Sequence, residues 1–446
     1  MFNKVLVANR GEIAVRIIRA CRAMGIATVA IHSTADASAL HAQLADEALC
    51  VGPASPLDSY LNQYAVLSAA VLTGAEAIHP GYGFLAENAK FARMCEKSDI
   101  AFIGPPPDPM ERMGDKLYAR RTMREAGVPI TPGSLEALTS VDEALALANE
   151  VGYPVMVKAA AGGGGRGIRK VDGPEQMESA FSQATAEAQM AFGDGRLFLE
   201  KCVLDARHIE FQIIADAHGN VVHLGERDCS MQRRNQKLLE EAPSSALDGE
   251  LRERMGRAAV AAARAVGYQN AGTVEFLVNR NHEFYFMEMN TRIQVEHPVT
   301  EMVTGVDLVQ EQLRVAAGEP LSFTQKDIVL RGHAIECRIN AEDPVHDFRP
   351  ACGTVEMLHI PQGPGVRFDS GLYVGWQVPP HYDSMLGKLI VHGRDREDAI
   401  ARMKAALMEI VVSGFPTNID FELDLVSHPG FEAGSYDTSF IAREMK

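Results

Sequence analysis

The chain has few cysteines, and they are not arranged as bridges or metal ligands usually are. Its 446 residues include 7 cysteines, an odd number, and none of them forms a CxxC pair. A disulfide framework needs paired cysteines, and so does a zinc ribbon. The cysteines therefore argue against both classes and favour a reducing compartment, which we expect to be the cytoplasm.

Long apolar runs are also missing. No stretch approaches the roughly 18 consecutive apolar residues of a membrane-spanning helix. The first residues pass almost at once into a short apolar strand, Val5-Leu6-Val7-Ala8, without the basic region and long apolar core of a signal peptide. We therefore expect neither a membrane anchor nor a membrane partner.

Positive charge is in deficit. Lysine and arginine total 43 against 59 aspartates and glutamates, which gives a net charge of -16. An overall basic surface for nucleic acid is therefore absent, and we expect no nucleic-acid partner. Any anionic substrate has to be bound by local positive groups.

Over its first hundred residues the chain alternates strands and helices, which predicts a parallel sheet with right-handed crossovers. The turn after the first strand, residues 8–12, lacks the GxGxxG pattern, so a dinucleotide site is not expected there. The expected strands are residues 4–8, 28–32, 77–79 and 101–104, and the expected helices are residues 12–24 and 60–72.

The run Gly104-Pro105-Pro106-Pro107 marks a break in this pattern. Mixed helices and strands follow it, and strands dominate from about residue 327. The length prior of about three domains agrees with this division. We expect domains at residues 1–113, 114–325 and 326–446, a strand at 152–158, hairpins at 211–224 and 273–286, a helix at 258–266, a strand at 334–338 and a helix at 397–408.

The most informative stretch is residues 288–297, which follows an aromatic strand at 284–286. Polar side chains stand at every second position, so an extended chain would place them on one face. Carboxylates beside carboxamides suit Mg²⁺, and an arginine among them suits an anionic substrate. A solvated strand face fits less well, because no turn residue separates the stretch from the apolar strand. The face would carry Glu288, Asn290, Arg292, Gln294 and Glu296.

A second carboxylate lies close by in the same predicted hairpin. Glu275 is on the strand before the turn, and Glu288 is on the strand after it. Adjacent antiparallel strands would bring both to one metal ion, and Asn290 would complete the ligand set. A cross-strand polar pair on a wet face is the alternative, but apolar neighbours flank both carboxylates. We therefore predict a metal site here.

A glycine-rich segment, residues 162–167, follows a strand that ends at Lys158. Backbone N–H groups without side chains approach phosphate oxygens closely. A surface turn is the commoner meaning of a glycine run, and no Gly-Lys-Ser/Thr follows to make a Walker A loop. The position after Lys158, with Arg166 inside the run, favours a phosphate clamp.

Other polar positions allow more than one interpretation. Lys237 ends a charged segment, residues 226–237, that would form the wall of an anion pocket. Cys229 within it is interpreted as a small buried side chain and not as a nucleophile. His79 at a strand end is a ligand position or a structural turn. Arg338, from the third domain, would cap the site or make a surface salt bridge.

In this order the motifs resemble the biotin carboxylase family of the ATP-grasp superfamily, from about residue 2 to 446. The resemblance implies an α/β (α+β) fold: an ATP-grasp domain with a mobile lid at about 131–203, between an N-terminal parallel α/β domain and a C-terminal strand-rich domain. The motifs are Asn9-Arg10-Gly11-Glu12-Ile13-Ala14, His79-Pro80-Gly81-Tyr82-Gly83-Phe84-Leu85, Met113-Gly114-Asp115-Lys116, residues 162–167, Glu226-Arg227-Asp228-Cys229-Ser230, residues 288–301 and Arg338-Ile339-Asn340-Ala341-Glu342-Asp343.

The resemblance implies carboxylation of biotin with ATP and bicarbonate through carboxyphosphate, as the first half-reaction of acetyl-CoA carboxylase in fatty acid biosynthesis. ATP and Mg²⁺ or Mn²⁺ are the implied cofactors. Biotin would arrive on a separate biotin carboxyl carrier protein, because no Ala/Val-Met-Lys-Met sequence occurs; carboxyltransferase subunits would act next. The alternatives are a propionyl-CoA, pyruvate or urea-type system, another ATP-grasp carboxylate–amine ligase, and a silent ATP-binding or scaffolding subunit.

The resemblance also implies residue roles and a homodimer. Ala23 and Pro364 stand where a well-known bacterial member has acidic and aromatic dimer contacts, and Asn235 stands where the family usually has histidine. The implied nucleotide contacts are Lys116, Lys158, Gly164, Gly165, Glu200, Lys201, Val203, His208, Gln232 and Asn235, with Glu275 and Glu288; the metal ligands are Glu275, Glu288 and Asn290. The implied bicarbonate set is Lys237, Arg292, Gln294, Val295 and Glu296, with Glu296 as the base, and the implied biotin contacts are Arg338 and Tyr82.

Overall fold

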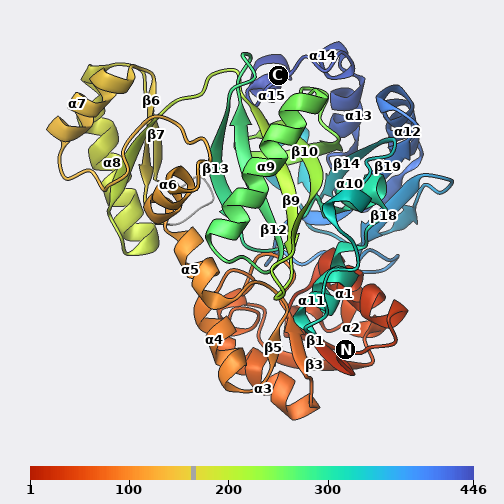
Figure 1. Ribbon diagram of the computed structural model, residues 1–446. Helices are drawn as coiled ribbons and strands as arrows, with labels where there is room; N and C mark the ends of the chain where they lie inside the picture. The colour runs from red at the N-terminus through yellow and green to blue at the C-terminus, as the bar shows by residue number, and fades with distance from the viewer. Residues whose placement is uncertain (162–166, 446) are drawn as a thin grey trace.

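The computed structural model describes residues 1–161 and 167–445. A lobe built on a parallel sheet contains the N-terminus, a long antiparallel sheet forms the centre, and a smaller lobe stands to one side (Figure 1). The predicted mixed α/β architecture is therefore confirmed. Within the described part of the chain, no helix has the length and apolar character needed to cross a membrane.

The N-terminal sheet is parallel throughout, as predicted. Its strands are β1 (Lys4–Val7), β2 (Ala27–Ser33), β3 (Glu47–Gly52), β4 (Ala77–His79) and β5 (Ala101–Phe102), and its helices are α1 (Gly11–Ala23), α2 (Leu40–Leu44), α3 (Gln63–Thr73) and α4 (Ala89–Lys97). The strand order is β3-β2-β1-β4-β5. Helix α1 packs Ile13, Ile17 and Cys21 against the buried strands, since these residues recur at helical spacing.

Capping residues explain why two helices begin at other residues than predicted. α3 begins at Gln63 instead of residue 60, because the side chain of Asn62 accepts a hydrogen bond from the backbone of Ala65. The helix predicted at 258–266 is longer: α9 (Gly249–Ala265) starts where the side chain of Asp248 accepts from the backbone of Leu251.

The central sheet has eight strands in the order β13-β12-β9-β10-β11-β14-β19-β18. The strands are β9 (Arg207–Ala215), β10 (Val221–Arg233), β11 (Gln236–Ala242), β12 (Asn270–Val278), β13 (Phe284–Asn290), β14 (His333–Asn340), β18 (Val366–Ser370) and β19 (Met385–Gly393). The two predicted hairpins are confirmed as the antiparallel pairs β9–β10 and β12–β13. Leu239 pairs with Cys337, so this sheet runs on through the third part of the chain.

The smaller lobe carries the sheet β7-β6-β8 and two helices on it (Figure 1). Its elements are β6 (Val155–Ala159), β7 (Ile168–Val171), β8 (Leu197–Lys201), α7 (Val141–Val151) and α8 (Met177–Phe192). The strand predicted at 152–158 begins later, because Gly152 ends α7. Val155, Val157 and Leu199 face a separate apolar core in this lobe.

The largest apolar core lies between the C-terminal helices and the strands β14 and β19. Ile335, Leu389 and Met403 are fully buried there. The helix predicted at 397–408 is confirmed as α12 (Arg396–Glu409). The other elements are α5 (Pro107–Gly114), α6 (Lys116–Glu125), α10 (His297–Thr304), α11 (Leu308–Ala316), α13 (Ile419–Ser427), α14 (Pro429–Glu432), α15 (Phe440–Glu444), β15 (Glu342–Asp343), β16 (Arg349–Pro350), β17 (Met357–His359) and β20 (Val411–Ser413).

Candidate active site

The two carboxylates expected to share a metal ion lie opposite each other on β12 and β13. Glu275 is the direct cross-strand partner of Glu288, and Thr273 is the partner of Asn290. The amide of Asn290 donates a hydrogen bond to Glu275 over 2.8 Å. Carboxylate and carboxamide oxygens gathered in this way form a hard donor set, which fits Mg²⁺ or Mn²⁺.

Glu275 is held in its charged form. Burial acts to raise its pKa, but Lys237 and His208 outweigh burial, and the pKa lies well below its ordinary value. His208 Nε2 is 3.0 Å from Glu275, and Gln294 donates to the same carboxylate over 2.9 Å. His208, Glu210 and Glu275 each place one ligand atom within 4.8 Å of the others. A buried carboxylate that stays ionised is well suited to bind a cation.

The stretch after β13 is not the extended strand that the alternation predicted. β13 ends at Asn290, and residues 291–296 form a loop that leads into α10. The prediction of a single polar face is wrong for this loop, because Ile293 and Gln294, neighbours in the alternating pattern, are both buried. Pro298 in the first turn of α10 favours a helix start here, since proline has no N–H to donate.

Lys237 on β11 lies at the centre of the group that the loop helps to build. Its Nζ is 2.6 Å from both Glu210 and Glu296, 3.2 Å from Glu275, and 3.5 Å from the amide oxygen of Gln294. Burial acts to lower the pKa of Lys237, but the acidic groups around it raise the pKa well above the ordinary value. The lysine is therefore charged and aimed into the site.

Arg338 reaches the same carboxylate from β14. Its Nη2 is 3.1 Å from Oε2 of Glu296, while Lys237 contacts Oε1. Burial acts to raise the pKa of Glu296, but Lys237 and Arg338 lower it below the ordinary value. Glu296 is therefore a carboxylate with a cation at each oxygen, just before α10. The expected base therefore contacts both Lys237, from the expected bicarbonate set, and Arg338, the expected biotin contact.

Arg292 fastens the loop to the N-terminal part of the chain. Its Nε lies 3.0 Å from Glu87, which also accepts a 3.0 Å hydrogen bond from the backbone of Thr291. The guanidinium of Arg292 donates to Asn290 over 3.2 Å as well. The side chain therefore contacts both an expected metal ligand, Asn290, and the N-terminal part of the chain, with its charge partly neutralised by Glu87.

The two lysines expected to bind phosphate stand beside carboxylates. Lys116 opens α6, and its Nζ is 3.3 Å from Glu288. Lys158 on β6 forms an ion pair with Glu200 on β8, and Arg120 contacts the same carboxylate over 2.9 Å. Burial acts to raise the pKa of Glu200, but Lys158 and Arg120 lower it. Glu200 is therefore an anion that positions Lys158.

The remaining expected nucleotide contacts are divided. Gln232 is hydrogen-bonded to His208 over 2.8 Å, and so joins the group around Glu275. Gly164 and Gly165, expected in the lid, lie outside the described residues. Among the described residues, no side-chain hydrogen bond or ion pair connects Lys201, Val203 or Asn235 to the group around Glu275.

Asn235 lies in the exposed turn between β10 and β11, next to Arg234. Both have left-handed backbone angles, with φ of 64° and 51°. Asparagine is among the few residues other than glycine that adopt this conformation readily. The turn itself therefore accounts for asparagine at position 235.

Tyr82 approaches the site through a buried ion pair. Its hydroxyl donates to Glu12, and the buried Lys388 lies 3.2 Å from the same carboxylate. Lys388 also donates to the backbone carbonyl of Val295 over 2.8 Å. Side chains from α1 and β19 thereby fix the loop at Val295, beside Glu296, the expected base.

Glu210 is a site residue that the sequence prediction did not include, although the alternation of polar and apolar residues around it could have identified it. Glu210 on β9 is completely buried and contacts both Arg227 and Lys237 over 2.6 Å. His208, Glu210 and Gln212 alternate with apolar residues, the pattern of a strand with one polar face. The strand was predicted to begin at residue 211, and that bound cut the pattern in two.

Two further buried charges carry no periodic signal. Glu240 is followed by Glu241 on β11, so one of two adjacent carboxylates faces the site and the other faces away. Lys388 lies in the strand sequence Gly387-Lys388-Leu389 with no acidic neighbour. Both residues find their partners only through the packing of distant elements. Cys229, by contrast, is buried as predicted.

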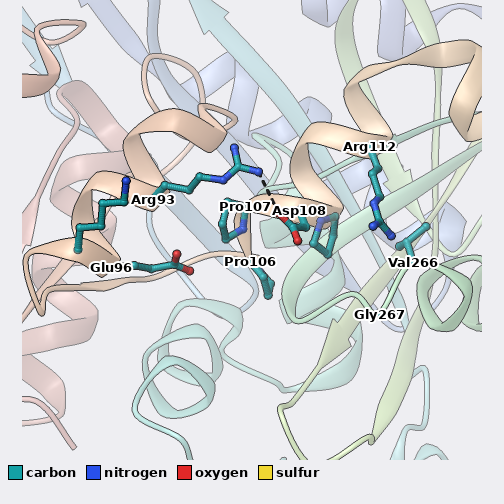
Figure 2. A pocket seen from close by; sticks show the side chains of 10 residues that line it. Arg93, Glu96, Pro106, Pro107, Asp108, Arg112, Val266 and Gly267 are labelled. Carbon is teal, nitrogen blue, oxygen red and sulfur yellow. Dashed lines mark hydrogen bonds and ion pairs between the residues drawn. The ribbon is translucent and has the colours of Figure 1, made fainter.

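A separate hollow of about 500 Å³ is lined by other residues, between α4, α5 and the chain just after α9 (Figure 2). Arg93 and Asp108 form an ion pair of 2.9 Å there, and Arg112 and Glu96 add charges of both signs. None of the residues expected in the site lines it. Its mixed charge does not favour an active site.

Models of known protein families match nearly the whole chain. The family model described as "Biotin carboxylase, N-terminal domain" matches residues 1–110, and "Biotin carboxylase C-terminal domain" matches residues 336–443. Between them, "Carbamoyl-phosphate synthase L chain, ATP binding domain" matches residues 115–324.

Similar proteins cover the chain almost end to end. A biotin carboxylase of Nostoc sp. is 60% identical over 440 residues, 99% of this chain and 98% of that protein. The biotin carboxylase domain dimer of Hydrogenobacter thermophilus 2-oxoglutarate carboxylase, solved with MgADP, ADP and bicarbonate, has a TM-score of 0.96 at 51% identity, covering 99% and 97%. The complex of Campylobacter jejuni biotin carboxylase with β,γ-ATP has a TM-score of 0.97 at 49% identity, covering 100% and 99%.

Proposed function

The chain belongs to the biotin carboxylase family, and from that premise we propose that it carries out the first half-reaction of acetyl-CoA carboxylase. It is an ATP-dependent ligase that carboxylates biotin with bicarbonate. The main support for the proposal is that Lys237 contacts one carboxylate oxygen of Glu296 and Arg338 contacts the other. This arrangement unites a base, an anion site and a candidate biotin contact.

Activation of bicarbonate comes first in the proposed reaction. Lys237, Arg292 and Gln294, with the backbone of Val295, bind bicarbonate, and Glu296 accepts its proton. In the unliganded arrangement Glu296 is a weak base, because Lys237 and Arg338 both stabilise its charge. A bound bicarbonate would draw these cations to itself and make Glu296 more basic, so that proton transfer follows substrate binding.

Phosphoryl transfer from ATP then makes carboxyphosphate. Lys116 and Lys158 bind the ATP phosphates, and Gly164 and Gly165 belong to the lid that closes over them. When bound by Glu275, Glu288 and Asn290, Mg²⁺ or Mn²⁺ supplies positive charge to the transferred phosphoryl group. We assign adenine and ribose contacts to Glu200, Lys201, Val203, His208, Gln232 and Asn235.

Carboxyphosphate then releases CO₂ and phosphate, and the phosphate removes the proton from the biotin nitrogen. The ureido oxygen becomes enolate-like, and Arg338, with Tyr82 nearby, stabilises it until the deprotonated nitrogen attacks CO₂ and forms carboxybiotin. Water has to be kept from the labile intermediate. The proposed lid, at about residues 131–203, serves that purpose.

The proposal extends to the domains of the chain, its oligomeric state and its partner proteins. We propose domains at residues 1–113, 114–325 and 326–446, a homodimer, and work in the cytoplasm with a biotin carboxyl carrier protein and carboxyltransferase subunits. Acetyl-CoA is the proposed final acceptor. A similar domain belongs to a 2-oxoglutarate carboxylase, which supports the proposal that partner subunits, and not this chain, set the acceptor.

Bicarbonate-dependent ATP hydrolysis with Mg²⁺, measured with and without free biotin, tests the activity. We expect strong stimulation by biotin, and we expect Arg338→Ala to lose it. The control is Arg314→Ala on α11, which removes an arginine paired with Glu311 and should keep the stimulation. Hydrolysis indifferent to biotin in the wild type would contradict the proposal and point to another ATP-grasp ligase, to be screened with amine and carboxylate acceptors.

A further inference from the structure

Glu240 on β11 contacts the guanidinium of Arg338. Oε1 of Glu240 accepts a 2.7 Å hydrogen bond from Nε of Arg338 and lies 2.5 Å from Nη2. The carboxylate is completely buried. Its other oxygen, Oε2, has no hydrogen-bond partner among residues 1–161 and 167–445. A buried carboxylate with one oxygen unsatisfied is costly, so its place beside Arg338 calls for an explanation.

The contacts of Arg338 divide the guanidinium into an occupied and an open part. Glu240 engages Nε and Nη2, and Glu296 engages Nη2 on the other side. Within the described part of the chain, no hydrogen bond engages Nη1. A planar guanidinium held along one edge presents its remaining N–H groups in a fixed direction.

We propose that Glu240 is a positioning residue, which holds Arg338 along the Nε–Nη2 edge so that Nη1 points toward the ureido oxygen of biotin. Without Glu240, Glu296 would be the carboxylate left in contact with the guanidinium among the described residues. Arg338 would then turn toward the base and away from biotin. This inference rests on the proposed function, because it assigns the orientation of the proposed biotin contact.

The electrostatic surroundings agree with this role. Burial raises the pKa of Glu240 to about 7, although Arg338 acts to lower it and Glu296 adds to the rise. Glu296 keeps the charge because Lys237 lies against it as well. The other charged or titratable groups that act on Glu240, or on which it acts, are Lys237 on the same strand, Glu336 and Cys337 on β14, Glu422 on α13 and Cys229 on β10.

A pH dependence follows from that surrounding. Above about pH 7 Glu240 is ionised and forms an ion pair with Arg338. Below that pH Glu240 is protonated, and most of its attraction to Arg338 is lost. We therefore expect kcat/KM for free biotin to rise through this range in the wild type. Hydrolysis without biotin involves Arg338 only through its contact with Glu296, so its pH dependence in this range should be smaller.

The near-isosteric variant Glu240→Gln tests the inference with free biotin as the probe. We expect its KM for biotin to rise roughly tenfold, the effect of losing one charge-assisted hydrogen bond. Bicarbonate-dependent hydrolysis without biotin should change by less than the KM for biotin, because it involves Arg338 only through Glu296. The rise of kcat/KM with pH near neutrality should disappear. Glu240→Asp, which keeps the charge, should retain the pH dependence while raising KM.

Glu241→Gln is the matched control, since Glu241 is the adjacent buried carboxylate and contacts His333 and Arg396 instead. It should lower the melting temperature without changing KM for biotin.

The outcomes separate this inference from the proposed function. A wild type without biotin stimulation overturns the proposed function itself. A stimulated wild type with a folded Glu240→Gln that matches it in KM and pH profile overturns the role of Glu240 alone. If Glu240→Gln does not fold, Glu240→Asp and the wild-type profile decide: an unchanged KM in Glu240→Asp contradicts the inference, as does a wild-type profile that is flat near neutrality.

Discussion

At the scale of single residues, Glu296 combines complete burial with ionisation. Lys237 and Arg338 keep Glu210 and Glu240 as partners when the charge of Glu296 is removed, so the removal should matter more for chemistry than for folding. We expect Glu296→Gln to lower bicarbonate-dependent ATP hydrolysis by roughly a hundredfold or more, as loss of a general base does. Nucleotide binding, measured by isothermal titration calorimetry, should be retained.

A control for this variant has to remove another buried carboxylate. Glu226→Gln does so, since Glu226 on β10 is buried and pairs with Arg252 over 2.7 Å. It should cost stability and keep hydrolysis near the wild-type rate per folded molecule. Full activity in Glu296→Gln would mean that another group takes the bicarbonate proton.

At the scale of elements, the hairpin of β12 and β13 shows what the sequence can predict. Its turn and the apolar runs on each side set the strands, and the register places Glu275 opposite Glu288. The next six residues could not be predicted in the same way. Alternation suggests a strand, whereas Pro298 and the contacts of Thr291 and Arg292 with Glu87 produce a loop.

The same hairpin leads to a prediction about metal binding. Glu288→Gln keeps the shape of the side chain but removes one of the two carboxylate charges expected to bind Mg²⁺. The Mg²⁺ concentration needed for half-maximal hydrolysis, beyond that bound by ATP, should rise roughly tenfold, equal to about 1.4 kcal/mol. Mn²⁺ binding followed by electron paramagnetic resonance should weaken in parallel, which checks the ligand role independently of activity.

Glu283→Gln is the matched control, because Glu283 is exposed and directly precedes β13 in the same hairpin. Its Mg²⁺ requirement should equal that of the wild type. Equal Mn²⁺ affinity in the wild type and Glu288→Gln would exclude Glu288 as a ligand and leave Glu275 and its neighbours to hold the metal.

At the scale of the whole molecule, the site depends on contacts between residues far apart in the chain. Glu87 meets Arg292, and Lys388 meets Val295. Local patterns predict strands, hairpins and the parallel N-terminal sheet, because these follow from spacing along the chain. They cannot predict which buried charge meets which, since that depends on how separate sheets and helices pack. Glu240 and Lys388 were missed for this reason.

The stability of the assembled molecule should therefore depend on buried charge, and Glu241 gives the clearest test. It contacts His333 over 2.7 Å, Arg396 over 2.8 Å and the hydroxyl of Tyr436. Burial acts to raise its pKa, but His333 and Arg396 lower it from 4.5 to about 2. A carboxyl pKa lowered by folding stabilises the folded state above about pH 4.5, and the stabilisation is lost as the pH falls toward 2.

For Glu241→Gln we expect a loss of about 3 kcal/mol of unfolding free energy near pH 7, because Arg396 is left without its buried partner. The wild type should lose stability between about pH 4.5 and 2 more steeply than the variant, which lacks that titrating group. Urea denaturation followed by circular dichroism over this range measures both, with Glu356→Gln at an exposed position as the control. Parallel curves for the wild type and the variant would show that the pKa of Glu241 is not lowered by folding, and that its contacts with His333 and Arg396 contribute through packing alone.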